Sequence, residues 1–328
     1  MTGPFFYAQR PYHRVVPPPS PLPARNGLSA AWVRTPDRDR SRATEWQTMG
    51  AWLRHKLPDY VDVTDMLERQ CFVDQTGRAV RDDDPFAHQQ FVWFHRDLRD
   101  EPTVTAAVHI VHRDERLVVV DKPPFLSTIP RGRHVMQSVV VRMRDQLNLP
   151  ELSPLHRLDR GTSGLLILAT EKRWRGMYQS LFEQREVQKT YWAQAPMRED
   201  LALPVVVRNH ISKERGILRA QVVAGAPVNA ETRIELESVS GGLGIYRLSP
   251  LTGRTHQLRV HMAGLGIPIV NDPLYPEVLE VEIDDFSNPL QLLAGELEFT
   301  DPVDGVQRRF RSVRRLPLAS EAGESTVA

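Results

Sequence analysis

The side chains best suited to chemistry lie in one short segment, His156-Arg157-Leu158-Asp159-Arg160-Gly161-Thr162-Ser163-Gly164. Asp159 stands between two arginines on a glycine-marked turn, and an apolar run follows directly. A nearby positive charge favours the ionised form of a carboxyl group, so Arg157 and Arg160 predict a charged carboxylate near neutral pH. An isolated Arg-x-Asp-Arg would more often be a loop ion pair. A carboxylate on a turn beside a rigid strand is, however, well placed for nucleophilic or acid–base chemistry.

The full string from His156 to Leu165 resembles the catalytic loop of the RluA-type family of RNA pseudouridine synthases. The resemblance implies that Asp159 acts on a target uridine, whose glycosidic bond breaks before the base rotates and rejoins through carbon. Whether Asp159 attacks C1′ of the sugar or removes a C2′ proton stays open. The reaction implies RNA as the partner and requires no cofactor or metal. Extruding a base from its stack costs a few kcal/mol, less in a loop than in a duplex.

Two further segments resemble family motifs in family order. Lys189-Thr190-Tyr191 resembles the second motif, in which a tyrosine stacks on the target base, although an ordinary core tyrosine on a strand is the alternative. Thr252 to Met262 resembles the third motif, in which a glycine turn precedes a helix. The resemblance implies that Arg259 pairs with the catalytic Asp, and Arg254 is the second candidate for that role.

Five side chains are predicted to contact the substrate: Arg157, Arg160, Arg254, His256 and Leu292. In the family, the arginine at the position of Arg157 can enter the RNA stack and fill the space left by the flipped nucleotide. A phosphate contact or a structural ion pair is the alternative. Arg160 is expected to contact the backbone or the loop. Leu292 begins Leu-Leu-Ala, where many relatives carry Leu-His-Ala, and predicts an apolar wall for the uracil.

Composition argues against several other classes of protein. Cys71 is the only cysteine, which excludes an intramolecular disulfide and a multi-cysteine zinc site. His256 and His261 are five positions apart, off one helical face and without a third ligand, so no metal site is predicted. No apolar run of about 18 residues and no signal segment is visible, so we expect a cytoplasmic protein without membrane contact. Monomer is the default expectation.

The charge balance gives little information about partners. The formal net charge is only +1, but five of the 42 basic residues are lysine and the others are arginine, which suits phosphates and base edges. A coding bias toward arginine codons predicts the same excess. An acidic stretch between positions 277 and 285 is expected to face away from RNA.

The elements that must position these side chains follow from apolar patterning. Strands are expected at 117–120, 165–169, 188–193, 205–211, 216–223, 230–238 and 244–249, and a helix at 171–186. The first strand ends at Lys122-Pro123, resembling the family's first motif. Pro124-Phe125-Leu126 then departs from the Ala-Gly-Leu that many members carry. The fold class is α+β (mixed α/β). The resemblance implies the pseudouridine synthase fold, a largely antiparallel mixed sheet flanked by helices and loops.

Four regions are predicted along the chain. Residues 1–45 form a Pro/Arg-rich extension, with order possible around Trp32 and Val33, and residues 319–328 a tail. Residues 46–103 form an S4-like RNA-binding module, with two short helices and a hairpin over 71–80, or else a generic α+β appendage. Residues 104–318 form the catalytic domain.

Two rival functions stay open. One is a non-catalytic RNA-binding protein that keeps the fold, although a binder has no use for a carboxylate facing RNA. The other is a glycosidic hydrolase, which usually needs two carboxylates; no second acid stands in the three motifs.

Overall fold

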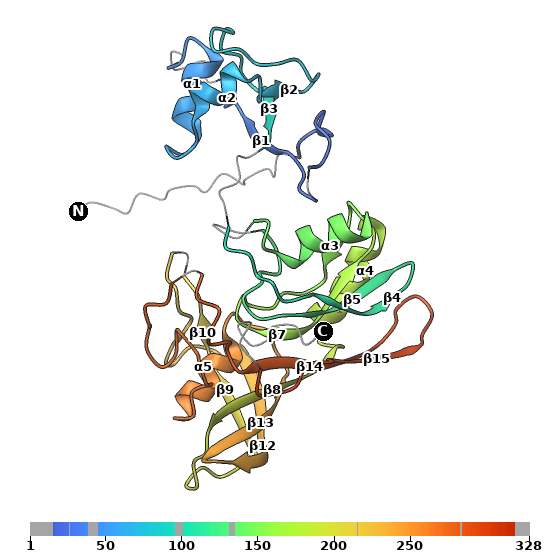
Figure 1. Cartoon of the computed structure of the whole chain (residues 1–328), viewed down its shortest axis with the longest axis vertical. Helices are drawn as coiled ribbons and strands as arrows, with labels where there is room; N and C mark the ends of the chain where they lie inside the picture. Colours follow the sequence, from blue (N-terminus) through green and yellow to red (C-terminus); the bar gives the residue numbers. More distant parts are fainter. Residues whose placement is uncertain are drawn as a thin grey trace, which may run out of the picture. The chain divides into compact units, whose positions relative to one another are not determined.

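The computed structural model describes residues 16–25, 27–38, 45–95, 101–130, 135–214, 216–282 and 284–318. The chain divides into two units, Met1–Leu98 and Arg99–Ala328, so the second unit begins slightly before the predicted boundary at residue 104 (Figure 1). The predicted tail at 319–328 lies outside the described residues. Each unit has its own hydrophobic core.

The first unit packs two helices against one face of a small sheet. The order of the strands is β1-β3-β2, and all pairs are antiparallel. Thr48 and Asp62 cap the two helices by accepting hydrogen bonds from backbone amides in the first turn. The elements are β1 (Ala31–Arg34), α1 (Met49–Lys56), α2 (Val63–Glu68), β2 (Val73–Asp74) and β3 (Phe91–Phe94).

Both predicted helices of this unit are confirmed, and the order considered around Trp32 and Val33 is observed as β1. Ala31 and Val33 pack against the helix-covered core and the strand pairs with β3, so this part of the predicted extension belongs to the first unit. The hairpin expected over 71–80 is reduced to β2 and one bridge between Val73 and Ala79. The S4-like assignment stays a prediction.

The second unit is built on a ten-stranded sheet with the path β4-β5-β7-β14-β8-β13-β12-β9. β15 pairs with β14, and β6 pairs with β7. Only the pairing of β7 with β14 is parallel among the described strands of this sheet, which confirms the predicted mixed, largely antiparallel architecture. The strands are β4 (His109–Arg113), β5 (Leu117–Lys122), β6 (Ser153–Pro154), β7 (Ser163–Ala169), β8 (Gln188–Pro196), β9 (Val205–Asn209), β12 (Ala230–Ser240), β13 (Leu243–Pro250), β14 (Leu292–Thr300) and β15 (Gln307–Arg311).

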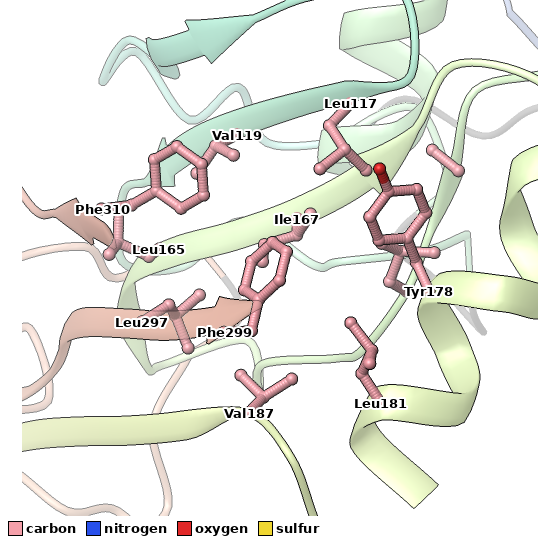
Figure 2. Close-up of a cluster of buried hydrophobic side chains, with 12 residues drawn as sticks. Leu117, Val119, Leu165, Ile167, Tyr178, Leu181, Val187, Leu297, Phe299 and Phe310 are labelled. Atoms are coloured by element: carbon pink, nitrogen blue, oxygen red, sulfur yellow. The ribbon is translucent and has the colours of Figure 1, made fainter. Parts of the chain in front are cut away.

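Three helices cover this sheet: α3 (Val139–Leu147), α4 (Lys172–Glu183) and α5 (Gln257–Gly264). Because successive side chains of a strand point to opposite faces, the odd-numbered residues of β5 and β7 meet Tyr178 and Leu181 of α4 (Figure 2). The even-numbered residues of the same strands meet α3. Both faces of these central strands are therefore buried.

Sequence patterning did not predict α3 or the strands β4 and β15. α3 begins with three valines, whose branched side chains lower helix propensity. The helix is stabilised instead by packing, since Val139, Val140 and Met143 lie in the core beneath β5 and β7. The strand expected over 216–223 is also wrong: only β11 (Gln221–Val222) forms there, and it pairs with β10 (Ile211–Ser212).

Gly164 allows β14 to approach the segment that carries Asp159. It has φ +107°, and a Cβ atom there would lie 2.2 Å from the backbone oxygen of Ala294. Only glycine satisfies both conditions. The close parallel pairing of Gly164 with Ala294 brings Leu292 to the end of the loop that contains Asp159.

We expect Gly164→Ala to destabilise the protein by at least about 1 kcal/mol, because the new methyl group meets backbone at a left-handed φ. Gly176→Ala is the matched control: Gly176 lies in α4 with open space around it, and alanine should stabilise the helix by roughly 0.5–1 kcal/mol. Denaturant unfolding measures both free energies. Equal stabilities of Gly164→Ala and the wild type would contradict this account.

Candidate active site

All eight site residues predicted from the sequence line one cavity of about 800 Å³ in the second unit. The cavity lies among the Asp159 loop, β8, the end of β13 and the start of α5. The predicted residues are Arg157, Asp159, Arg160, Tyr191, Arg254, His256, Arg259 and Leu292. Three separate motifs therefore converge on one site, although the individual roles of these residues stay predictions.

The backbone on both sides of Asp159 is fixed by the segment that follows β5. Lys122 is fully buried, and its Nζ donates to the carbonyl oxygens of Pro123 (2.9 Å), Leu126 (2.8 Å) and Arg160 (3.1 Å). The Thr128 hydroxyl donates to the Leu158 carbonyl oxygen and accepts from the Leu158 amide. Burial lowers the pKa of Lys122 well below its ordinary value. The first motif thus holds the loop rather than the substrate.

Asp159 is partly open to the cavity, with 36% of its side chain exposed. Arg259 Nη1 and His256 Nε2 each lie 3.9 Å from its Oδ2. Arg157 and Arg160, which flank it in sequence, form no ion pair with it in the described structure. The cations that face the carboxylate therefore come from the third motif. The expectation that its sequence neighbours supply the nearest positive charge is corrected, because the described ion pairs of Asp159 are with Arg259 and His256.

Arg259 is buried and is held by a second carboxylate, that of Asp272. Its Nε donates to Asp272 Oδ2 at 2.8 Å and its Nη2 to Oδ1 at 2.5 Å, while its guanidinium lies over the Tyr275 ring. Asp272 Oδ1 also accepts from the backbone amides of Leu274 and Tyr275. This bidentate pair leaves Nη1 directed toward Asp159.

Of the two arginines considered as partners of Asp159, the geometry favours Arg259. Arg254 lines the cavity, but its Nε donates to the carbonyl oxygen of Asn229. The turn before α5 is fixed by Gln257, whose Oε1 accepts from the Thr252 hydroxyl and the Arg254 amide. The turn over residues 264–273 resembles a turn in family members and was expected to scaffold the site, but Asp272 itself was not predicted as a site residue.

Tyr191 faces the cavity from β8, where it pairs with Leu248 and Ala294. Burial raises the pKa of its phenol, and the charge of Asp159 raises the pKa further. The hydroxyl therefore stays protonated at neutral pH. Leu292, two residues before Ala294, adds the predicted apolar side chain to the same wall.

His256 begins the turn into α5 in a left-handed conformation, with φ +58°. Its Nδ1 lies 2.9 Å from the Tyr275 hydroxyl, which donates to the Ala220 carbonyl oxygen. Burial lowers the pKa of His256, which favours the neutral ring. His261 instead contacts Asn209, so the two histidines do not converge. In the described ranges, no group of three or more His, Cys, Asp or Glu residues is arranged to hold a metal ion.

The cavity wall is strongly basic. Six arginine and lysine side chains line it, against only Asp159 and Glu183. Two of these cations, Arg185 and Lys189, were not predicted as site residues. The acidic residues between positions 277 and 285 that the structure describes do not line it. Within the same described residues, every helix is too short or too polar to cross a bilayer.

Comparison with known proteins assigns the family. A model described as RNA pseudouridylate synthase matches residues 116–264. Dual-specificity RNA pseudouridine synthase RluA of Salmonella typhi is 32% identical over 209 residues, which cover 62% of this chain and 91% of that protein. The chain belongs to the RluA-type family of RNA pseudouridine synthases.

Two human proteins extend the comparison. Pseudouridylate synthase RPUSD2 of Homo sapiens is 37% identical over 186 residues, but the match covers 55% of this chain and only 33% of that protein. The chain therefore spans about a third of the length of this relative. The structure of human RNA Pseudouridylate Synthase Domain Containing 1 covers 66% of this chain and 94% of its own, with 23% identity and a TM-score of 0.51. This likeness supports the shared fold.

We expect Asp272→Asn to lower the free energy of unfolding by about 3–5 kcal/mol, because the buried Arg259 would lose its charged partner. Asp200→Asn is the matched control: Asp200 pairs with Arg198 but keeps 70% of its side chain exposed, so the loss should stay within about 1 kcal/mol. Chemical denaturation of both variants measures the difference. If the two losses were equal, Asp272 would not be the anchor of Arg259.

Proposed function

We propose that this protein isomerises specific uridines in structured RNA to pseudouridine, with Asp159 as the catalytic group. The proposal rests on the position of Asp159, which is partly exposed in the cavity. Its Oδ2 lies 3.9 Å from Nη1 of the buried Arg259. As a carboxylate, Asp159 could attack C1′ or accept the C2′ proton, and the proposal commits to neither route.

The remaining lining side chains fit a flipped nucleotide. Tyr191 offers a phenol ring on which a base can stack, and Leu292 adds an apolar side chain. Stacking on an aromatic ring contributes about 1–3 kcal/mol per base, comparable to the cost of extruding the base. The excess of arginine and lysine around the cavity suits the phosphates on either side of the target.

Arg157 is the proposed replacement for the extruded nucleotide. It is exposed and lines the cavity beside Asp159. This position supports insertion into the RNA stack, with a phosphate contact as the alternative role. Arg160, Arg254 and His256 are the other proposed substrate-contacting residues.

We also propose a class of RNA substrate, the absence of a cofactor and a subcellular localisation. Ribosomal RNA is favoured over transfer RNA because an S4-like first unit would suit it. The chemistry uses only the carboxylate and its surroundings, so no cofactor is proposed. We further propose that the protein is a monomer, lies in the cytoplasm and does not contact a membrane.

One observation favours the alternative of a glycosidic hydrolase: Glu183 places a second carboxylate in the cavity lining. Glycosidases usually use two such groups. Hydrolysis would release free uracil, whereas isomerisation keeps the base attached to the RNA. Product analysis therefore separates the two reactions. A non-catalytic RNA-binding protein would give neither product.

We expect Asp159→Asn to abolish pseudouridine formation on bulk RNA and to leave RNA affinity within about two-fold, because the variant keeps the shape of the side chain but removes its charge. Nucleoside analysis after incubation measures the product, and filter binding measures the affinity. Asp200→Asn, a substitution of an exposed residue that does not line the cavity, should keep wild-type turnover. Detectable turnover by Asp159→Asn would exclude the proposed role.

Mapping pseudouridines in RNA from cells with and without this protein should reveal positions that depend on it. We expect these positions in ribosomal RNA, at uridines in loops where extrusion costs less. Restoring the wild-type chain should restore them, and restoring Asp159→Asn should not. Dependence confined to transfer RNA would overturn the preferred substrate but keep the reaction.

A further inference from the structure

Phe125 adopts a backbone conformation that favours glycine. Its φ is +62°, in the left-handed region that bulky side chains rarely occupy. It stands in the segment Pro124-Phe125-Leu126, directly after β5 and the Lys122-Pro123 pair. A phenylalanine in this conformation is retained only where its surroundings hold it in place. The contacts of its ring with neighbouring side chains therefore indicate what holds Phe125 in this conformation.

The Phe125 ring helps to hold the side chain of Arg160. The Arg160 guanidinium carbon lies 5.7 Å from the centroid of the Phe125 ring and 5.9 Å from that of the Phe286 ring. The two rings are themselves 5.3 Å apart. The ring faces carry negative charge density and attract a cation, most strongly where water is excluded. Phe125 is only 9% exposed, whereas Arg160 and Phe286 are partly buried, so the contact on the Phe125 side is the one shielded from solvent.

Phe286 comes from a different part of the chain. It follows the acidic stretch, in a turn closed by Asp285, whose carboxylate accepts from the Ser287 amide at 2.9 Å. Phe286 also packs against the core beneath β5 and β7. The arrangement thus joins three segments that are remote in sequence: the turn after β5, the catalytic loop and the loop before β14.

Arg160 directly follows Asp159, so fixing its side chain restricts the catalytic loop. Its backbone carbonyl accepts from Lys122, which also binds the carbonyl oxygens of Pro123 and Leu126 on either side of Phe125. The turn after β5 therefore holds Arg160 by its backbone and by its side chain. Hydrogen bonding through Lys122 does not involve the ring of Phe125, so the second restraint is separate.

We propose that Phe125 and Phe286 form an aromatic clamp on Arg160 and act as positioning residues for Asp159. The role in isomerisation rests on the proposed function; the restraint on the loop does not. A misplacement of about 1 Å in a reacting group can slow catalysis by roughly a hundred-fold, so a clamp one residue from the carboxylate would affect the chemical step.

Variants that remove or keep the rings test the clamp in the full chain. Phe125→Gly removes one ring while suiting the left-handed backbone, Phe286→Leu removes the other, and Phe125→Tyr keeps an aromatic ring. Phe310→Leu is the matched control, because Phe310 is 8% exposed but packs in the α4-side core. Hydrogen exchange of the backbone over residues 157–162 measures the restraint, and single-turnover rates with RNA affinities measure the consequence.

We expect Phe125→Gly and Phe286→Leu to raise exchange over 157–162 and to slow single turnover roughly ten- to hundred-fold, with RNA affinity within about two-fold. Phe125→Tyr keeps an aromatic ring, so its hydrogen exchange over 157–162 and its single-turnover rate should both match those of the wild type. The double variant should be little slower than the worse single variant, because either change opens the same clamp. Phe310→Leu should leave exchange over 157–162 as in the wild type.

If Phe125→Gly showed the same backbone hydrogen exchange over 157–162 as the wild type, the clamp would be overturned. It would also be overturned if the two substitutions slowed single turnover multiplicatively in the double variant. A wild-type protein that forms no pseudouridine on any RNA would overturn the proposed function instead. In that case raised exchange in the two single variants would still support the restraint, so the two failures are distinguishable.

Discussion

The site depends on the buried side-chain nitrogen of Lys122. Lys122 lies at the end of a strand that is covered on both faces, where an uncompensated charge would be very unfavourable. Its three carbonyl acceptors satisfy it, and one of them belongs to Arg160. A single side chain thereby connects a strand that is buried on both faces to the loop of Asp159. Thr128 and the aromatic clamp add further links between the same segments.

The electrostatics of the cavity combine one partly exposed acid with a basic wall. Asp159 faces Arg259, whose orientation is set by a buried bidentate pair with Asp272. A guanidinium held by one carboxylate can approach a second without large motion, because its planar fork presents several donors. The surplus of positive charge around Asp159 suits a polyanionic substrate. The proposed reaction and the proposed RNA binding would therefore use the same basic wall.

Much of the fold was predictable because its strands are strongly patterned. The runs Leu117–Val120 and Leu165–Ala169 are apolar throughout, as expected for strands buried on both faces. α3 was not predictable, since its opening valines disfavour a helix and only the sheet beneath stabilises it. β1 was placed in a tail because its pairing partner, β3, lies far away in sequence. Local propensity carries no information about such partners.

The sequence motifs were sufficient to predict the family and eight of the side chains that line the cavity, because each motif keeps its residue types in consecutive positions. The folded structure was needed to show which of these side chains interact. Asp159 is faced by Arg259 and His256 rather than by its neighbours in the chain. Asp272 and Phe286 join the site from separate loops, and the sequence analysis singled out neither residue. Spacing along a chain describes neighbours on one element, whereas these contacts join separate elements through the folded sheet.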